Sequence, residues 1–554
     1  MRLYELWSAR WDCTGVCFLD IIAMPTLHWI GKDKVINHHA EVPFRVLEHK
    51  YGFRGENPED QSETHSGNKI IHGDNLVALK ALLPEYEGKI DCVYIDPPYN
   101  TGNEGWVYND NVNDPHIRKW LGEVVGAEGE DLTRHDKWLC MMYPRLRLLH
   151  QLLSHNGVIF ISIDKNEFAN LNLLCEEVFG RKCFVADLIW RSADSSNHDS
   201  KQFSYDYNHT LVYSRTPGWE PNRIARTEDN NRHYLNPDND PKGPWCPGNL
   251  SSPNPRSNLT YDVISPKGIA IHSPKNGWRW SWDTMKAMIE DGEIVFSNDG
   301  TRIIRKTYLC EQQGLVPSDI WWDIEDTGHN RNAKYELKKI FPEKNTSELF
   351  KTPKPTKFID KILQIASQKD SIILDSFAGS GTTAHAVIKK NHEDGGNRKF
   401  ILVELMDYAE TITAERVRRV INGYGEGRKA VTGLGGSFDY YELGEPLFQD
   451  DGNLNESVGI DKMRAYIYYS ETHQYLNREQ DAEHPYLLDY LDGTGYFFYY
   501  EPNEITTLSH DALTIVPKAA DHYVIYADIC TISKEELSQK NITFKKIPRD
   551  INRF

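Results

Sequence analysis

Residues 371–384 read SIILDSFAGSGTTA, an apolar run followed by a glycine-rich turn. Within the turn, Gly379, Gly381 and Ala384 satisfy the pattern G-x-G-x-x-A of doubly wound nucleotide-binding sheets. The apolar run predicts a buried strand before the turn, and residues 382–390 predict a helix after it. Because glycine lets a ligand approach the backbone closely, this strand–turn–helix context predicts a nucleoside-binding site.

The next strand supports this interpretation. Residues 400–403 (FILV) form a short apolar run, and Glu404 follows where a ribose-binding acid is expected. The alternative is a glycine turn that only joins a strand to a helix, a role that requires no acid at this distance. A phosphate loop of the ATPase type is excluded, because Gly381 is followed by Thr382 and not by lysine.

A second loop carries the motif DPPY at residues 96–99. It follows a predicted buried strand, residues 90–95 (IDCVYI), which the two prolines end. Ligands of open α/β sheets bind beyond the carboxyl ends of the strands, so this loop and the glycine turn are expected to face one crevice. The structural alternative is a proline loop with a capping Asp and a packed Tyr.

The DPPY residues suit the binding of an amino group on a flat base. The Asp96 carboxylate and a backbone carbonyl of Pro97 or Pro98 can together accept both amine hydrogens, which localises the nitrogen lone pair and gives the proton a route away. The prolines stiffen the loop and so preorganise these acceptors. Tyr99 offers a flat face for an unstacked base.

A sulfonium is the methyl donor that suits this arrangement, because it is cationic, is bound through adenosine and needs no metal. Asp375 before the glycine turn and Glu404 after it are placed to neutralise and orient such a cation. Methyl transfer would then depend mainly on positioning the two reactants. Hydride transfer from a nicotinamide is disfavoured, since nothing in the DPPY loop suits it.

Together these motifs resemble the amino methyltransferases of DNA that use S-adenosylmethionine. DPPY is the catalytic motif of that family and FAGSG (377–381) its cofactor motif. The catalytic motif comes first here, the β-class permutation, in which a target-recognition domain lies between the two halves. Four segments further resemble the methylation (Mod) subunit of type III restriction–modification systems: HGDNLVALKALLPEY (72–86), DPPYNTG (96–102), KPTKFIDKIL (354–363) and FAGSGTT (377–383). The resemblance covers residues 24–425.

The resemblance implies a role for each matching residue. Phe377 would pack on the adenine of the donor and Glu404 would bind its ribose. The methionine end would be held near Lys354 and Pro355, followed by Thr356. The remaining positions expected beside the cofactor are Asp74, Asn75, Asp375, Ala378, Gly379, Ser380, Gly381 and Thr382. In this family DPPY usually accompanies adenine, so adenine-N6 methylation is implied, with cytosine-N4 methylation as the alternative.

The predicted fold class is α/β, a doubly wound and mostly parallel Rossmann-like sheet, circularly permuted, with an inserted domain and a C-terminal α+β module. Within the first half, residues 135–153 have helical spacing, and Pro144 is expected to kink or split that helix. The expected ranges are an N-terminal extension (1–67), the catalytic half (68–215), the target-recognition domain (216–345), the cofactor half (346–429) and the C-terminal interaction module (430–554).

Charge predicts where DNA would bind. Lys+Arg 63 against Asp+Glu 81 leaves a formal charge of −18, so cations must be concentrated locally to bind phosphates. The inserted range interleaves cations with tryptophans, as in NGWRWSW (276–282), although these tryptophans can equally be core residues. The predicted DNA contacts are Arg279, Arg302, Arg305 and Lys306.

The predicted partners are double-stranded DNA, a second copy of the chain in a homodimer, and a separate restriction (helicase–nuclease) subunit, because the chain has no nuclease or helicase motif of its own. The chain could also serve mainly as the DNA-reading subunit of such a complex.

Nine scattered cysteines without zinc-finger spacing favour reduced thiols in the cytoplasm and no metal site. No membrane span is expected, and residues 1–23 are predicted to be an extension without a folded role.

Overall fold

The computed structural model describes residues 27–55, 57, 59–101, 131–345, 347–478, 483–516 and 520–549. It also describes the backbone of two short strands, β1 (Ala9–Arg10) and β2 (Phe18–Leu19), which pair with each other. The other residues of the expected 1–23 extension, and Gly102 of the DPPYNTG segment, lie outside the described residues. The chain divides into two compact units, residues 221–317 and the rest.

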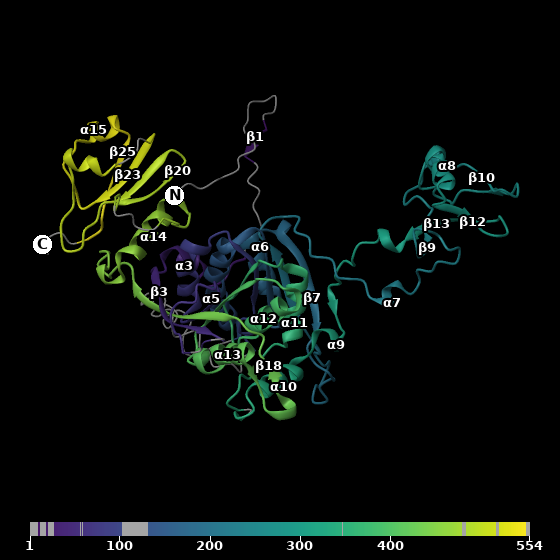
Figure 1. Ribbon diagram of the computed structural model, residues 1–554, viewed down its shortest axis with the longest axis horizontal. Helices are drawn as coiled ribbons and strands as arrows, with labels where there is room; N and C mark the ends of the chain where they lie inside the picture. Colours follow the sequence, from purple (N-terminus) through teal and green to yellow (C-terminus); the bar gives the residue numbers. More distant parts are fainter. Residues whose placement is uncertain are drawn as a thin grey trace. The chain divides into compact units, whose positions relative to one another are not determined.

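The larger unit is built on a ten-stranded sheet (Figure 1). Six neighbouring strands, from β6 to β19, run parallel, whereas β8 is antiparallel to β6 and β7, and β3 is antiparallel to β19. This mostly parallel α/β sheet confirms the predicted fold class. In order across the sheet the strands are β14 (Ile320–Trp321), β7 (Phe184–Arg191), β8 (Tyr207–Ser214), β6 (Leu153–Ile163), β5 (Ile90–Ile95), β15 (Ile372–Asp375), β16 (Lys399–Glu404), β4 (Lys69–His72), β19 (Ser437–Pro446) and β3 (Arg45–Arg54).

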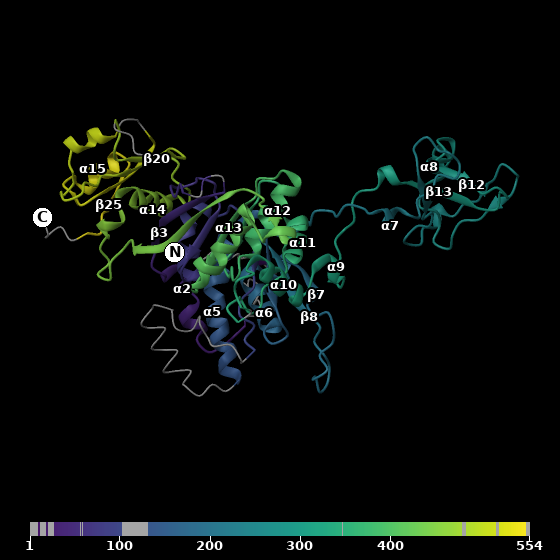
Figure 2. The same ribbon diagram turned by 60° about the horizontal axis from the view of Figure 1, so that its bottom comes forward.

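Helices cover both faces of this sheet (Figure 2). One layer contains α3 (Asn75–Tyr86), α5 (Asp131–Leu152) and α6 (Phe168–Phe179), and the other contains α11 (Thr356–Ala366), α12 (Thr382–Asp394) and α13 (Glu415–Asn422). Val93 of β5 packs in the core with the first layer, while Tyr94 meets Phe358 of α11. Because successive residues of a strand point to opposite faces, the two layers lie on opposite sides of the sheet.

Of the two outcomes predicted for Pro144, a kink or a split of the helix, the split does not occur. Helix α5 continues through Pro144 from Asp131 to Leu152. Helices α3 and α6 both pack against it, and Leu146, Leu148, Leu149 and Leu152 are fully buried. This burial offsets the lost backbone hydrogen bond, a case in which tertiary packing overrides a local helix-breaking preference.

The sheet extends beyond the two ranges predicted for it. Strand β3 comes from the expected N-terminal extension, and β19 comes from the expected C-terminal module. β19 pairs with both β4 and β3, so the large sheet is completed by segments almost 400 residues apart, as in the hydrogen bond between Arg45 and the Gly444 carbonyl (|i−j| 399). The later C-terminal residues form a second sheet of β20 (Leu487–Leu491), β21 (Thr494–Phe498), β23 (His522–Ala527) and β25 (Ile542–Lys546).

The smaller unit, residues 221–317, lies within the predicted range 216–345. Its three-stranded antiparallel sheet contains β12 (Ile294–Phe296), β13 (Ile303–Tyr308) and β9 (Trp245–Gly248). Helix α8 (Trp282–Glu290) contributes Met285 to a small core that also contains Trp278. The unit therefore has its own apolar core.

Candidate active site

The DPPY loop and the glycine turn lie at the ends of adjacent strands. β5 and β15 are parallel neighbours, with Cys92 opposite Ile373 and Val93 opposite Leu374. Continuing this register places Asp96 level with Phe377. The chain leaves β5 toward β6 on one side and β15 toward β16 on the other, so the two loops flank the switch point at which open α/β sheets bind ligands.

Asp96 is held by a lysine from the other half of the site. The Lys354 Nζ forms an ion pair with Asp96 Oδ2 and donates to the Tyr99 hydroxyl at 2.9 Å. Lys354 also lies over the Tyr99 ring, 5.2 Å from its centroid. Desolvation and the Asp96 charge keep the pKa of Tyr99 well above its usual value, so its hydroxyl stays protonated.

Buried polar contacts with side chains of α5 and with Glu167, just before α6, fix the DPPY loop in place. The Trp138 indole donates to the Pro98 carbonyl at 2.7 Å. Asn100, which has a left-handed φ of 59°, donates to the fully buried Glu167. His135 Nδ1 lies 2.6 Å from the same carboxylate. Neither Trp138 nor Glu167 stands out in the sequence, because both are far from the motif along the chain.

The glycine turn has no room for side chains at its two left-handed positions. Gly379 has φ 52° and Gly381 has φ 76°. A β-carbon on Gly379 would lie 2.9 Å from the Phe350 ring, and one on Gly381 would lie 3.0 Å from the Thr413 carbonyl. Thr413 also donates to the Gly379 carbonyl at 2.6 Å, which fixes the turn.

Asp375 is a buried acid at the start of the turn. Its carboxylate accepts hydrogen bonds from the Phe377 N–H, at 3.1 Å, and from the Thr383 hydroxyl. Burial raises its pKa to about 7, and the nearby Asp96 and Glu404 carboxylates add to the rise, against the effect of the two hydrogen bonds. A cation placed next to Asp375 would favour its ionised form.

Glu404 ends β16 and braces the same turn. Its Oε2 accepts from the Gly379 N–H at 2.7 Å, and its Oε1 accepts from the Met406 N–H at 3.0 Å. Burial raises its pKa, and these backbone N–H groups oppose that rise. The predicted acid therefore lies beside the glycine turn, where the sequence spacing placed it.

Asp74 and Asn75 begin α3 at the edge of the site. Asp74 caps the helix by accepting from the Leu76 N–H at 2.8 Å. Asn75 donates to the Ser376 carbonyl at 2.8 Å, and it accepts from the buried Arg145 of α5. Arg145 also reaches Asp74, so an arginine that carries no motif signal holds both residues in place.

A second buried arginine lies under the glycine turn. Arg416 of α13 donates to Thr382 Oγ1 at 2.8 Å and to Ser380 Oγ at 3.1 Å. Its other terminal nitrogen donates to the hydroxyl of Thr356, the first residue of α11 after Pro355. Ala378, the remaining predicted residue of the turn, is buried and bonds through its N–H to the Val403 carbonyl.

The predicted DNA contacts of the smaller unit differ in environment. Arg302 and Arg279 are exposed, and the guanidinium groups of Arg279 and Arg305 lie 5.9 Å and 5.1 Å from the Trp280 ring. Lys306, in contrast, is only 7% exposed and is paired with Asp240 and, at 2.6 Å, with Asp238. The geometry therefore separates Lys306 from the three arginines and indicates an internal structural role.

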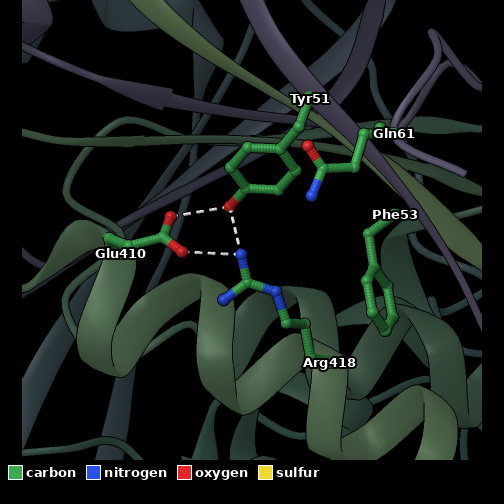
Figure 3. Close-up of a pocket in the computed structure, with 6 residues that line it drawn as sticks. Tyr51, Phe53, Gln61, Glu410 and Arg418 are labelled. Atoms are coloured by element: carbon green, nitrogen blue, oxygen red, sulfur yellow. Dashed lines mark hydrogen bonds and ion pairs between the residues drawn. The ribbon is translucent and has the colours of Figure 1, made fainter. Parts of the chain in front are cut away.

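The larger unit also has a hollow of about 340 Å³ away from these motifs (Figure 3). It is lined by Tyr51, Phe53, Gln61, Glu410 and Arg418. Arg418 is paired with Glu410 at 2.6 Å, and Tyr51 donates to the same carboxylate at 2.6 Å. Since the charges of this hollow neutralise each other, it offers no net charge to a ligand.

Two features are absent from the described part of the chain. No group of three or more His, Cys, Asp or Glu side chains that could hold a metal ion is present there. Across those same residues, no helix combines the length and the apolar character that crossing a membrane requires.

The chain is thus an α/β protein whose doubly wound sheet brings two loops to the ends of adjacent strands, with a buried acid beside the glycine turn. A family model described as DNA methylase (N6_N4_Mtase) matches residues 90–471. The chain is 35% identical over 398 residues to the Mod subunit of the type III restriction–modification enzyme StyLTI of Salmonella typhimurium, covering 68% of this chain and 57% of that protein. It is 31% identical over 430 residues to the EcoP15I Mod subunit of Escherichia coli, covering 69% and 64%.

A type II methyltransferase, M.KpnI of Klebsiella pneumoniae, is 30% identical over 367 residues, covering 61% of this chain and 81% of that protein. The chain therefore belongs to the DNA methylase family of N6 and N4 methyltransferases. This confirms the resemblance predicted from the motifs. The chain spans less than two thirds of the length of the two Mod subunits it matches.

Proposed function

We propose that this protein is a site-specific DNA adenine-N6 methyltransferase, and that it acts as the modification subunit of a type III-like restriction–modification system. The observation that carries the proposal is the position of Asp96 beside the glycine turn, at the carboxyl ends of adjacent strands. The Mod subunits among its relatives support the assignment to a restriction–modification system.

The target amine would be held by Asp96 and one backbone carbonyl. Asp96 Oδ1 is buried and has no hydrogen-bond partner among the described residues, so it can accept one amine hydrogen. The Pro98 carbonyl already accepts from Trp138, which leaves the Pro97 carbonyl as the second acceptor that we assign. The base would lie against Tyr99 after it leaves the DNA stack.

The residues around the glycine turn fit S-adenosylmethionine. Gly379 and Gly381 give the turn its left-handed backbone, and Asp375 and Glu404 offer carboxylates to a cationic ligand with ribose hydroxyls. When bound, this cofactor supplies a methyl group on a sulfonium sulfur. Asp96 would hold the amino nitrogen in line with that methyl group, and its carboxylate would take the proton that the nitrogen loses as the C–N bond forms and the C–S bond breaks.

We also propose double-stranded DNA as a partner. The exposed Arg279 and Arg302, with Arg305, supply the local positive charge that DNA binding by an acidic chain requires. We further propose a homodimer, cytoplasmic location and a separate restriction subunit.

Cytosine-N4 methylation is the second candidate, because the family includes both chemistries. The deciding experiment incubates the purified protein with labelled methyl donor and unmethylated DNA and then identifies the labelled nucleoside. We expect labelled N6-methyladenine with the natural protein and none with Asp96→Ala. Labelled N4-methylcytosine would replace the first candidate with the second, and no label in either base would refute both.

A further inference from the structure

Lys354 connects the two halves of the proposed active site. Its side chain is 7% exposed and reaches Asp96 Oδ2 and the Tyr99 hydroxyl. Its backbone carbonyl accepts from Thr382 Oγ1 at 3.2 Å, at the end of the glycine turn. The lysine is therefore fixed to the cofactor turn through its main chain and to the DPPY loop through its ammonium group.

The ammonium group distinguishes the two oxygens of Asp96. Within the described residues, Oδ2 is held by Lys354, while Oδ1 is buried without a hydrogen-bond partner. A carboxylate on its own can turn about its last bond, and either oxygen could then face the substrate. A charge-assisted hydrogen bond to one oxygen stops that rotation and leaves the other oxygen with a set direction.

We propose that Lys354 is a positioning residue for methyl transfer, which holds Asp96 so that Oδ1 faces the target amine. This inference rests on the proposed function, and it replaces the role in binding the methionine end of the cofactor that the family resemblance implies. An ammonium group has donors only, so Lys354 cannot itself accept the amine hydrogens or the departing proton.

The neighbouring contacts keep Lys354 in place. Thr382 receives a hydrogen bond from the buried Arg416 at 2.8 Å, so the group that holds the Lys354 carbonyl is itself fixed. Pro355 follows directly and precedes α11 with φ −71°. The position of the lysine backbone is thus set by the glycine turn and α11, and the side chain extends from there to Asp96.

The first test compares Lys354→Met with Lys354→Arg, and uses Lys351→Met as the matched control because Lys351 is exposed. The measurements are kcat and KM with unmethylated DNA, and cofactor affinity by calorimetry. For Lys354→Met we expect kcat to fall about 100-fold, a typical effect of losing one oriented donor, with cofactor affinity within twofold of the natural protein. Lys354→Arg should recover part of kcat.

An unchanged kcat in Lys354→Met would overturn the proposal. So would a tenfold loss of cofactor affinity with kcat unchanged at saturating cofactor, which would restore the cofactor-binding role. If the natural protein methylates no DNA, the proposed function itself is refuted. If the natural protein is active and both Lys354 variants have the same kcat as the Lys351→Met control, only the inference about Lys354 is refuted.

A double-mutant cycle tests whether Lys354 acts through Asp96, and its Lys354→Arg arm applies even when Lys354→Met does not fold. We expect Lys354→Arg to slow the natural protein several-fold and to leave Asp96→Asn unchanged. In Asp96→Asn the cation holds the amide oxygen, and the NH2 group that then faces the target amine cannot accept its hydrogens. Equal fold-losses in both backgrounds would show that Lys354 acts independently of Asp96, which contradicts the proposal.

Discussion

Arg416 lies buried beneath the glycine turn and donates to Thr382 Oγ1 at 2.8 Å. The same guanidinium group bonds to Ser380 and Thr356, and it lies 3.5 Å from the Glu336 carboxylate. One side chain thereby joins the turn, the start of α11 and helix α13. The shape of the glycine turn depends on a residue more than thirty positions away from it in the sequence.

Replacing this arginine should unfold the site and lower global stability. For Arg416→Met we expect the free energy of unfolding to fall by about 3–5 kcal/mol, because the variant leaves buried hydroxyls and Glu336 without their partner. Arg419→Met is the control, since Arg419 lies in the same helix, about one turn after Arg416, and is partly exposed. Urea denaturation measures both, and equal effects would contradict a special role for Arg416.

Cofactor binding should depend on pH through Asp375. Its pKa is raised to about 7, so the protonated form dominates at pH 6 and the carboxylate dominates at pH 8. A cationic cofactor favours the carboxylate, and affinity should therefore rise up to about tenfold over this interval. Calorimetric titration between pH 6 and 8 measures this, and the pH dependence should flatten in Asp375→Asn.

The same acid has the opposite effect on stability without cofactor. In the unfolded chain Asp375 ionises near its ordinary pKa of 3.8, while the folded protein raises that pKa to about 7. The unfolded state thus binds fewer protons between these values, and stability contributed by this group falls as pH rises from about 4 to 7. Thermal unfolding across this range should show a smaller decline in Asp375→Asn.

The glycine turn offers a matched pair of substitutions. Gly381→Ala and Gly395→Ala both place a side chain at positive φ, 76° and 65°, which costs about 1–2 kcal/mol in each case. Only at Gly381 does the new β-carbon also meet a backbone atom, the Thr413 carbonyl at 3.0 Å, while the space beside Gly395 is open. We expect both variants to lose stability, and only Gly381→Ala to lose cofactor affinity.

Charge reversal should separate DNA contacts from structural cations in the smaller unit. Arg279→Glu and Arg302→Glu should weaken DNA binding and reduce its salt dependence, while cofactor binding stays unchanged. Lys306→Glu should instead destabilise the unit, because it would bury a third acid beside Asp238 and Asp240. Fluorescence anisotropy at several salt concentrations and circular dichroism distinguish these outcomes.

Short-range chemistry allowed much of the site to be predicted. Several site residues could be recognised from their neighbours in the sequence, because each one sets the local backbone or the end of a strand. These residues are Gly379, Gly381, the two prolines after Asp96, and Glu404. The expected strands and helices around them agree closely with β5, β15, β16 and α12. The meeting of the two loops at one edge of the sheet followed from these elements, since parallel strands bring their carboxyl ends to the same edge.

Long-range contacts could not be predicted in this way. Lys354 and Asp96 are 258 residues apart, and Trp138 and Pro98 are 40 apart. The pairing of Lys306 with Asp240, and the continuous helix through Pro144, likewise depend on packing by other segments. The sequence by itself determined the sheet class and the positions of the two loops, because local backbone preferences encode them. Only the tertiary structure decided which buried charges hold those loops, because such contacts form when distant segments meet in the folded chain.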